Sequence, residues 1–363
     1  MEKIAPGEIV KTYKHLFEKI VAFDNLLLAA KKAQKGKRFK TATARFHINL
    51  EKELLCLQRQ LKNQSYSPGP YTEFYIFEPK KRMISAAPYR DRVVHHALCN
   101  VIEPIFENTF IFDSYANRKR KGTHRAILRY QQFCRKNRYV LKCDVVKFFP
   151  SIDHMILKNE IRRKITDPDA LWLIDNIIDH SNEQESVLHY FPGDDLFQPY
   201  ERRRGLPIGN LTSQFFANVY MNRFDHFVKE NLKCRYYVRY VDDWAVFHDD
   251  KSFLHDALFE FNKYLEILRL RMHATKSKVF PVDVGLTFLG HRIFTDHRLL
   301  KRDNVVRFKR RLKVYQKLYR QDDINWTEVK QRLQSWNAHA AFSDTYRLRM
   351  KLFSEFGFSK DAA

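Results

Sequence analysis

The sequence predicts an α+β fold, in which short strands and amphipathic helices are interspersed along 363 residues. Short runs rich in β-branched and aromatic residues, such as residues 236–247, predict strands. Longer stretches with apolar residues at every third or fourth position predict helices. Hydrophobic residues make up 44% of the chain. A chain of this length and composition buries a sizeable core, which we expect to divide into two or three subdomains.

The charge balance of the chain is strongly basic. Lys and Arg number 65 against 42 Asp and Glu, a formal net charge of +23. Such a surplus predicts a polyanionic partner, with nucleic acid as the first candidate and a membrane surface as the rival. No apolar run is long enough to span a bilayer, and the N-terminal residues lack a signal-peptide pattern. We therefore expect no membrane partner and a cytoplasmic location. The scattered cysteines are expected to be buried, reduced thiols: Cys56, Cys99, Cys134, Cys143 and Cys234.

Residues 1–70 predict a helical extension. Apolar residues recur at helical spacing in two sets, one within residues 16–27 and the other within residues 46–61. The basic tract between them, residues 31–38, is either a solvated loop or a contact to RNA phosphates. A strand is expected over residues 71–77, and the turn after it makes a basic hairpin with residues 82–86.

The central part of the chain alternates between strands, helices and loops. A helix is expected to begin at Pro88, and a strand is expected over Tyr139–Asp144. Residues 152–178 are predicted to be mainly helical. Residues 181–200 are rich in Gly, Pro and Asp and predict an irregular insert without an evident chemical role.

A long helix is predicted to follow residues 205–210, and its start has two candidate capping residues, Asn210 and Thr212. The next elements are the 236–247 hairpin and a helix over residues 253–268. Short strands are expected at 276–280 and 286–292. The chain closes with helices whose apolar stripes are Val305, Phe308, Leu312, Tyr315 and Tyr319, and then Val329, Leu333, Trp336 and Ala340.

Three carboxylates follow strand-like runs: Asp144, and the adjacent pair Asp242 and Asp243. A turn lets neighbouring side chains lie on the same side, so both members of the pair can approach one metal site. Mg²⁺ prefers oxygen ligands and takes only a few carboxylates. Acids packed together without a metal repel each other. These three residues are therefore the candidate ligands of two divalent ions of the kind that assist phosphoryl transfer. For the pair taken alone, a solvated acidic hairpin tip is the alternative.

These residues resemble the motifs of reverse transcriptases, and the resemblance is ordered along nearly the whole chain. Asp144–Phe149 resembles the first catalytic motif of that family, and Tyr240–Asp243 resembles the second. The resemblance implies a right-hand polymerase fold with a fingers subdomain at 71–137, a palm at 138–301 and a helical thumb at 302–363. The palm would contain a finger or loop insert at about 181–204.

One motif resembles a narrower group, the reverse transcriptases of diversity-generating retroelements. Most reverse transcriptases have Gln-Gly before the long palm helix, whereas this chain has Ile208-Gly209, followed by Asn-Leu-Thr-Ser-Gln. Residues 335–340, Ser-Trp-Asn-Ala-His-Ala, also resemble that group. The resemblance implies copying of a template-repeat RNA into cDNA with frequent errors opposite adenine. It also implies a pentameric accessory variability protein as a partner, besides dNTPs, template RNA and the cDNA or primer.

The resemblance also implies roles for individual residues. Asp144 and Asp242 would bind both Mg²⁺ ions, for which Mn²⁺ is a possible substitute, with the Val145 carbonyl as a further ligand and Asp243 as a weaker one. Phe149 would exclude a 2′-hydroxyl, or else it packs in the core. The residues implied in nucleotide binding are Lys81, Arg82, Arg118, Phe148, Phe149, Ile208, Gly209, Gln214 and Lys276. Among them Lys81, Arg82 and Arg118 are equally suited to general RNA contacts.

The first helix of the predicted thumb has a basic face above its apolar stripe. We expect this face to lie along a phosphate backbone, and an ordinary solvated face is the alternative. Its cations are Arg307, Lys309, Arg310, Arg311, Lys313 and Lys317. Two other functions remain open. One is a defence-associated or group II intron-like reverse transcriptase, and the other is a non-catalytic RNA-binding protein with a degenerate polymerase fold.

Overall fold

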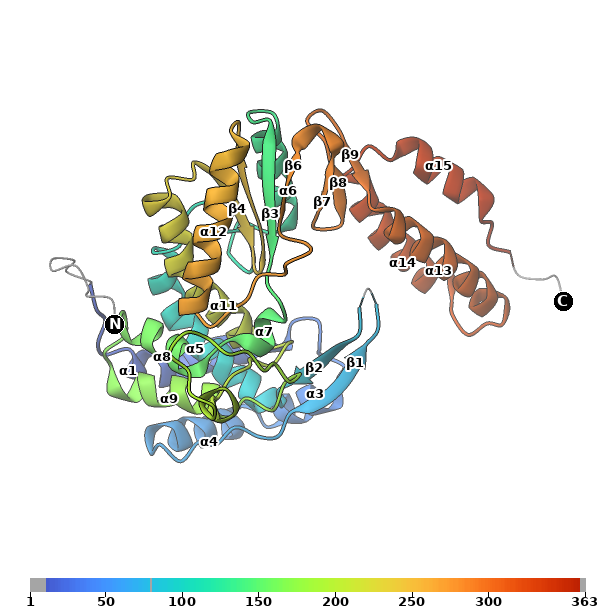
Figure 1. The fold of residues 1–363 in the computed structure, drawn as a ribbon. Coiled ribbons are helices and arrows are strands. Elements are labelled where there is room, and N and C mark those ends of the chain that lie inside the picture. The colour runs from blue at the N-terminus through green and yellow to red at the C-terminus, as the bar shows by residue number, and fades with distance from the viewer. Residues whose placement is uncertain (1–10, 79, 360–363) are drawn as a thin grey trace. The chain divides into compact units, whose positions relative to one another are not determined.

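The computed structural model describes residues 11–78 and 80–359. The chain forms two compact units. The first contains the residues up to Phe112 together with Asp144–Lys233 and Phe259–Ala274. The second contains Asp113–Cys143, Cys234–Leu258 and the residues from Thr275 onward. Helices and antiparallel strands are mixed along the chain (Figure 1), which confirms the α+β prediction.

The first unit begins with four helices, α1 Phe17–Val21, α2 Phe23–Gln34, α3 Thr41–Ile48 and α4 Leu50–Lys62. The single helix expected within residues 46–61 is wrong at its start, because Asn49 leaves the helical conformation (φ −112°, ψ 34°) between α3 and α4. Helix α5, Tyr89–Glu107, packs against α2 and also against α11, Leu211–His226. The predicted basic hairpin is confirmed, with β1 Thr72–Ile76 antiparallel to β2 Arg82–Ala86.

The rest of the first unit contains the short helices α7 Phe148–Ser151, α8 His154–Arg162, α9 Pro168–Asp179 and α10 Gln198–Glu201. Helix α11 continues into a π-helical turn, η1, over Phe227–Asn231. Asn210 precedes α11, but its side chain does not cap the helix, and no cap by Thr212 is seen either. That prediction is wrong because the Asn210 amide is bonded to β2 and to the segment after it.

The insert at 181–200 is irregular, as predicted, and is held by charged and polar contacts. Arg202 forms ion pairs with Asp194 and with Asp153, whose carboxylate lies 3.5 Å from Arg202 Nε. Arg271 donates a hydrogen bond to the carbonyl of Tyr190. These contacts attach the insert to the start of α8 and to Arg271, both in the first unit.

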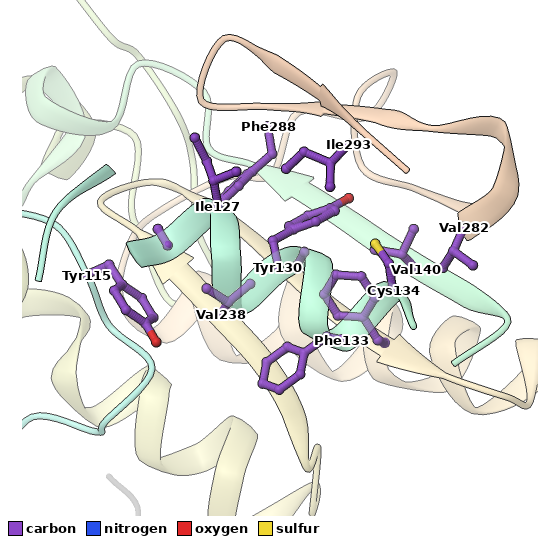
Figure 2. Close-up of a cluster of buried hydrophobic side chains, with 13 residues drawn as sticks. Tyr115, Ile127, Tyr130, Phe133, Cys134, Val140, Val238, Val282, Phe288 and Ile293 are labelled. Carbon is purple, nitrogen blue, oxygen red and sulfur yellow. The ribbon is translucent and has the colours of Figure 1, made fainter. Parts of the chain in front are cut away.

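The second unit is built on a four-stranded sheet with the order β4-β5-β3-β6. The strands are β3 Tyr139–Asp144, β4 Tyr236–Tyr240, β5 Asp243–His248 and β6 Lys278–Pro281. Helix α6, Thr123–Cys134, packs against β4 and β5. Figure 2 shows Tyr130 of α6 at the centre of the hydrophobic cluster, between side chains of the sheet and of the strands that follow it. Helix α12, Lys251–Ile267, contributes residues to both units.

A smaller sheet follows, with β7 Leu286–Phe288, β8 His291–Ile293 and β9 Arg298–Leu300, after the short 3₁₀ turn η2 at Val282–Val284. The single strand predicted over residues 286–292 is wrong, because the chain reverses between β7 and β8. Leu289 and Gly290 both have positive φ there (50° and 86°), and this conformation breaks a strand and makes a tight turn.

The second unit ends in three helices, α13 Arg302–Arg320, α14 Trp326–Ala341 and α15 Tyr346–Glu355 (Figure 1). Phe308, Leu312 and Leu352 form their core, and Trp336 packs against it. Asn325 and Glu328 form a reciprocal capping box at the start of α14. Within residues 11–78 and 80–359, no helix is long and apolar enough to cross a bilayer. The five cysteines, all in described segments, form no disulfide; Cys56 is exposed, contrary to the prediction, whereas the other four are buried.

Candidate active site

The acidic pair lies at the tip of the β4–β5 hairpin. Tyr240 is paired with Asp243, so the connecting turn consists of Val241 and Asp242 alone. Val241 has a φ of 58°, a left-handed conformation that is unfavourable for a β-branched residue. The hairpin therefore holds a strained backbone at the residue before the first carboxylate of the pair.

A buried arginine fixes this turn. Arg239 of β4 has no exposed surface, and its Nη1 donates a hydrogen bond of 2.9 Å to the carbonyl of Val241. Its Nη2 lies 3.2 Å from Ser114 Oγ. The backbone of Arg239 is also bonded, since its N–H donates to Asp113 and its carbonyl accepts from Tyr115. The turn is thus anchored through one side chain to a segment more than a hundred residues earlier.

The sheet order places β3, which ends at Asp144, next to β5, which begins at Asp243. Lys142 of β3 lies 3.8 Å from Asp243 Oδ1, and its Nζ donates to the carbonyl of Thr287 at 2.7 Å. Lys142 thus lies within ion-pairing distance of Asp243. Burial, with smaller contributions from Cys134 and Asp243, raises the pKa of Tyr130 well above its ordinary value, so the Tyr130 hydroxyl is neutral.

Asp144 belongs to the first unit. The residue before it in β3, Cys143, belongs to the second unit. Its carbonyl accepts a hydrogen bond of 2.8 Å from His273 N–H, and Val145 bridges to Met272. Further along, Phe148 is buried and Phe149 is partly exposed, with their rings 5.5 Å apart and edge to face. Of these two aromatic residues, Phe149 is thus the one with surface available to a ligand.

The loop before α11 is held against the β1–β2 hairpin in the first unit. Ser85 N–H donates to the carbonyl of Ile208 at 3.0 Å, and the Asn210 amide bonds Ser85 O at 2.9 Å. Gly209 has a φ of 117°, and a Cβ there would lie 2.9 Å from Ile84 Cγ2, so only glycine suits this position. The Ile208 side chain is partly exposed.

A backbone bond connects this loop to the residues after Asp144. Leu206 N–H donates to the carbonyl of Phe149 at 2.9 Å. Within the first unit, the structure therefore joins three segments that are distant in sequence: residues 144–149, residues 206–210 and β2. Gln214 is partly exposed in the first turn of α11, which follows the same loop.

The predicted cationic contacts are accessible to solvent. Lys81 and Arg82 are exposed in the basic hairpin, and Lys81 Nζ lies 4.6 Å above the Tyr75 ring. Arg118 donates a hydrogen bond of 2.9 Å to the carbonyl of Ser114, the residue that also contacts Arg239. Lys276 is exposed just before β6.

On α13 the predicted basic face has different surroundings at different positions. Arg310, Arg311, Lys313 and Lys317 are exposed, whereas Arg307 and Lys309 are partly exposed. Lys309 Nζ lies 3.3 Å from Glu355 Oε2 of α15. An internal carboxylate thus already compensates part of the charge of Lys309.

The residues around the hairpin fit a divalent metal in the chemistry of their donors. Asp144, Asp242 and Asp243 are each partly exposed, so their carboxylate oxygens are accessible to ions whose other ligands come from a substrate. Within residues 11–78 and 80–359, no three His, Cys, Asp or Glu side chains form a group that by itself could hold a metal ion. Whether these acids act together as a metal centre remains a prediction.

Two residues at this site, Arg239 and Lys142, have roles that the sequence motifs do not predict. An arginine within a run of aromatic and β-branched residues is a detectable signal, because a charged side chain in a buried strand requires hydrogen-bond partners. The partners themselves are not detectable, since Ser114 lies in a segment without strand periodicity. The role of Lys142 depends on the order of the strands.

Known proteins that are similar to this chain identify its family. A family model described as reverse transcriptase (RNA-dependent DNA polymerase) matches residues 72–293, more than half of the chain. Protein YkfC of Escherichia coli is 27% identical over 281 residues, which cover 66% of this chain and 71% of that protein. The group II intron-encoded protein LtrA of Lactococcus lactis is 25% identical over 189 residues, 51% of this chain but only 30% of LtrA.

A putative COX1/OXI3 intron 1 protein of Saccharomyces cerevisiae is 22% identical over 178 residues, 48% of this chain and 20% of its own length. The chain thus spans less than a third of the intron-encoded relatives. The matched segment of the family model nevertheless includes both strand-end carboxylate motifs, the basic hairpin and the Ile208 loop. The chain belongs to the reverse transcriptase (RNA-dependent DNA polymerase) family and is homologous to group II intron-encoded proteins.

Proposed function

We propose that Asp144, Asp242 and Asp243 serve two-metal phosphoryl transfer at the 3′ end of a growing DNA strand. Two Mg²⁺ ions, or Mn²⁺ in their place, would activate the attacking hydroxyl and stabilise the leaving group when bound. Asp144 and Asp242 would hold both ions, with the Val145 carbonyl as a further ligand and Asp243 as a weaker one. The observation that supports this proposal is the sheet order, in which β3 and β5 are neighbours and their ends carry these acids.

The other site residues would bind and orient the substrates. Arg239 holds the backbone of the turn that carries Asp242 through its hydrogen bond to the Val241 carbonyl. Phe149 would contact the sugar and exclude a 2′-hydroxyl. Lys81, Arg82 and Arg118 would bind the triphosphate, because multiple cationic donors suit a phosphate group.

We further propose that the chain is the reverse transcriptase of a diversity-generating retroelement. It would copy a template-repeat RNA into cDNA with frequent errors opposite adenine and work with a pentameric accessory variability protein in the cytoplasm. The observation that supports this is the loop 208–214, where Ile208 replaces the usual polar residue. An apolar side chain offers no hydrogen bond to the nascent base pair, and a missing hydrogen bond lowers discrimination between substrates.

A group II intron-like reverse transcriptase is the second candidate. The similarity to LtrA and to the yeast intron protein favours it. A defence-associated reverse transcriptase is a third possibility with the same fold. A near-duplicate repeat pair and a small accessory gene beside this gene would favour the retroelement, and their absence would favour the other two.

Sequencing of cDNA tests the retroelement proposal. We expect the wild type to misincorporate mainly opposite template adenine and Ile208→Gln to reduce this bias, because the amide restores hydrogen bonding. Ile208→Leu is the matched control and should keep the wild-type spectrum. The backbone at this position should be unchanged, since the hydrogen bond from Ser85 involves only the Ile208 carbonyl.

The two parts of the proposal fail in different ways. An error spectrum of the wild type without an adenine bias would exclude the diversity-generating function. An adenine bias that persists in Ile208→Gln would keep the function but exclude Ile208 as its determinant.

A further inference from the structure

A pocket of about 660 Å³ lies within the first unit, and it is lined by residues at the ends of α5 and α8 and by residues of α11, η1 and α12. Its volume falls within the range of small-ligand sites. None of the described lining residues belongs to the sets predicted for catalysis, metal binding or substrate binding. Helix α11 changes into the π-helical turn η1 at this pocket. Such turns are rare and are frequently found at functional sites.

Each acidic side chain among the described lining residues already has a cationic partner. Glu160 Oε1 lies 3.3 Å from Arg223 Nη1. Glu230 Oε1 lies 2.6 Å from His226 Nδ1, and His226 Nε2 lies 2.8 Å from the carbonyl oxygen of Thr109. Both atoms that face the imidazole are acceptors, so both ring nitrogens donate and the ring is charged. Burial lowers the pKa of His226, but the hydrogen bonds to the Thr109 carbonyl and to Glu230 raise it above its ordinary value.

Two further cations of the pocket have no such partner. Arg163 and Lys164 follow α8 directly, and both are partly buried. Within residues 11–78 and 80–359, neither side chain forms an ion pair. The pocket therefore has an excess of positive charge, which favours an anion. An arginine beside a lysine suits the oxygens of a phosphate group.

An amide oxygen in the same pocket lacks a donor. Asn222 Nδ2 donates to Thr109 Oγ1 at 3.1 Å, and Thr109 Oγ1 donates to the Phe106 carbonyl at 2.7 Å. Because the Thr109 hydroxyl proton is already used, Thr109 Oγ1 can only accept from Asn222, and this fixes the orientation of the amide. Asn222 Oδ1 is buried and has no donor among the residues that the structure describes. A buried acceptor without a donor is unfavourable, so a ligand that supplied an N–H group here would be stabilised.

We propose that this pocket binds a free nucleotide. Its phosphate contacts Arg163 and Lys164, and an amino group of its base donates to Asn222 Oδ1. A nucleotide combines both groups in one molecule of a size that suits the pocket. The inference depends neither on the diversity-generating role nor on the proposed metal centre.

Equilibrium dialysis of the full chain with nucleoside monophosphates tests the pocket. The buffer contains EDTA, so that divalent ions at the candidate active site do not contribute. The ligands are AMP, GMP and CMP, whose bases have amino groups, and purine riboside monophosphate, whose base has no N–H. We expect at least one of the first three to bind about tenfold more tightly than the purine riboside compound. Asn222→Leu should abolish that difference, and urea unfolding checks that this variant, whose side chain has a similar shape, stays folded.

The same assay tests the two cations. Arg163→Gln/Lys164→Gln should weaken binding of the tightest nucleotide about tenfold, because hydrogen bonds to charged groups are the stronger ones. Lys35→Gln/Lys40→Gln removes two exposed cations outside the pocket and should bind the nucleotide as the wild type does. This control separates the pocket from a general attraction of anions to a basic chain. Inorganic phosphate that binds as tightly as the nucleotide would contradict the proposal.

Photolabelling locates the site without any substitution. An azido derivative of the tightest nucleotide should label a peptide from residues 160–164 or 219–231, and the unmodified nucleotide should prevent labelling. The proposal is wrong if none of the nucleotides binds, or if the pocket variants bind as the wild type does and the label lies elsewhere. Binding without metal, primer or template is the readout, so a failure of catalysis is separable from a failure of the pocket.

Discussion

In the candidate site, Val241 has a left-handed backbone conformation that its β-branched side chain disfavours. The left-handed conformation costs an L-residue about 1–2 kcal/mol, whereas a glycine adopts it freely at an entropic cost of roughly 0.5–1 kcal/mol. The two effects nearly cancel at this position. The Arg239 hydrogen bond to the Val241 carbonyl helps to maintain this conformation.

Val241→Gly should therefore change the free energy of unfolding by less than about 1 kcal/mol. Val238→Gly, in the same strand pair, is the matched control. Val238 is fully buried in the cluster of Figure 2, and the substitution should destabilise the protein by at least about 2 kcal/mol. Urea unfolding measures both values. A large loss in Val241→Gly would show that the turn is not strained.

His291 is the residue that predicts a pH dependence for the second unit. It is fully buried, and its Nδ1 lies 2.7 Å from Ser343 Oγ. Burial, together with nearby His339, His124 and Arg298, lowers the pKa of His291 to about 4. In the unfolded chain its pKa is about 6.5. As the pH falls below that value the unfolded state gains a proton that the folded state does not, so stability is lost down to about pH 4.

We expect His291 to account for a loss of about 2 kcal/mol in the free energy of unfolding between pH 7 and pH 5. His291→Gln removes the titrating group and should reduce the pH dependence by that amount. Burial lowers the pKa of His95 in the first unit to about 3, so His95 adds a dependence of the same sign that the variant retains. Identical pH profiles for wild type and variant would contradict this assignment.

At the scale of elements, the sequence predicts most strands and helices but not their interruptions. The strand Tyr139–Asp144 and the 236–247 hairpin agree with the structure, because runs of β-branched and aromatic residues are local signals. The separation of β7 from β8 was missed. It depends on positive φ at Leu289, a residue that gives no turn signal. The cap at Asn210 was mispredicted because the sequence does not reveal that β2 competes for its amide.

The salt dependence of nucleic-acid binding tests the predicted function of helix α13. Lys313 and Lys317 are four residues apart, so they lie on one side of the helix, and both are exposed. If each contacts a phosphate, Lys313→Gln/Lys317→Gln should lower the slope of log K against log salt concentration by about 0.7–0.9 per residue. A single Lys330→Gln substitution should leave the slope unchanged. An unchanged slope in the double variant would show that these two lysines contact solvent and no phosphate.

At the scale of the whole molecule, the residues predicted to act in catalysis and binding are distributed over both compact units. Residues 144–149, the 206–210 loop and the basic hairpin belong to the first, whereas the Asp242–Asp243 hairpin, Arg118 and Lys276 belong to the second. Motifs in a fixed order along the sequence indicate these residues. Such motifs predict the chemical role of a residue but not its contacts in the folded chain. The anchoring of the turn by Arg239 and Ser114 required the tertiary structure, because two distant segments supply it.

The most direct test of the central claim is Mg²⁺-dependent dNTP incorporation on a primed RNA by carboxylate-to-amide variants. The amide keeps the shape of the side chain but removes the charge that a divalent cation requires. Asp144→Asn and Asp242→Asn should each lower kcat at least about a hundredfold with RNA affinity unchanged, and Asp243→Asn should lower it less. Asp256→Asn, an exposed acid of α12, should retain full activity. Incorporation by Asp144→Asn or Asp242→Asn at the wild-type rate would contradict the assignment of these acids as metal ligands.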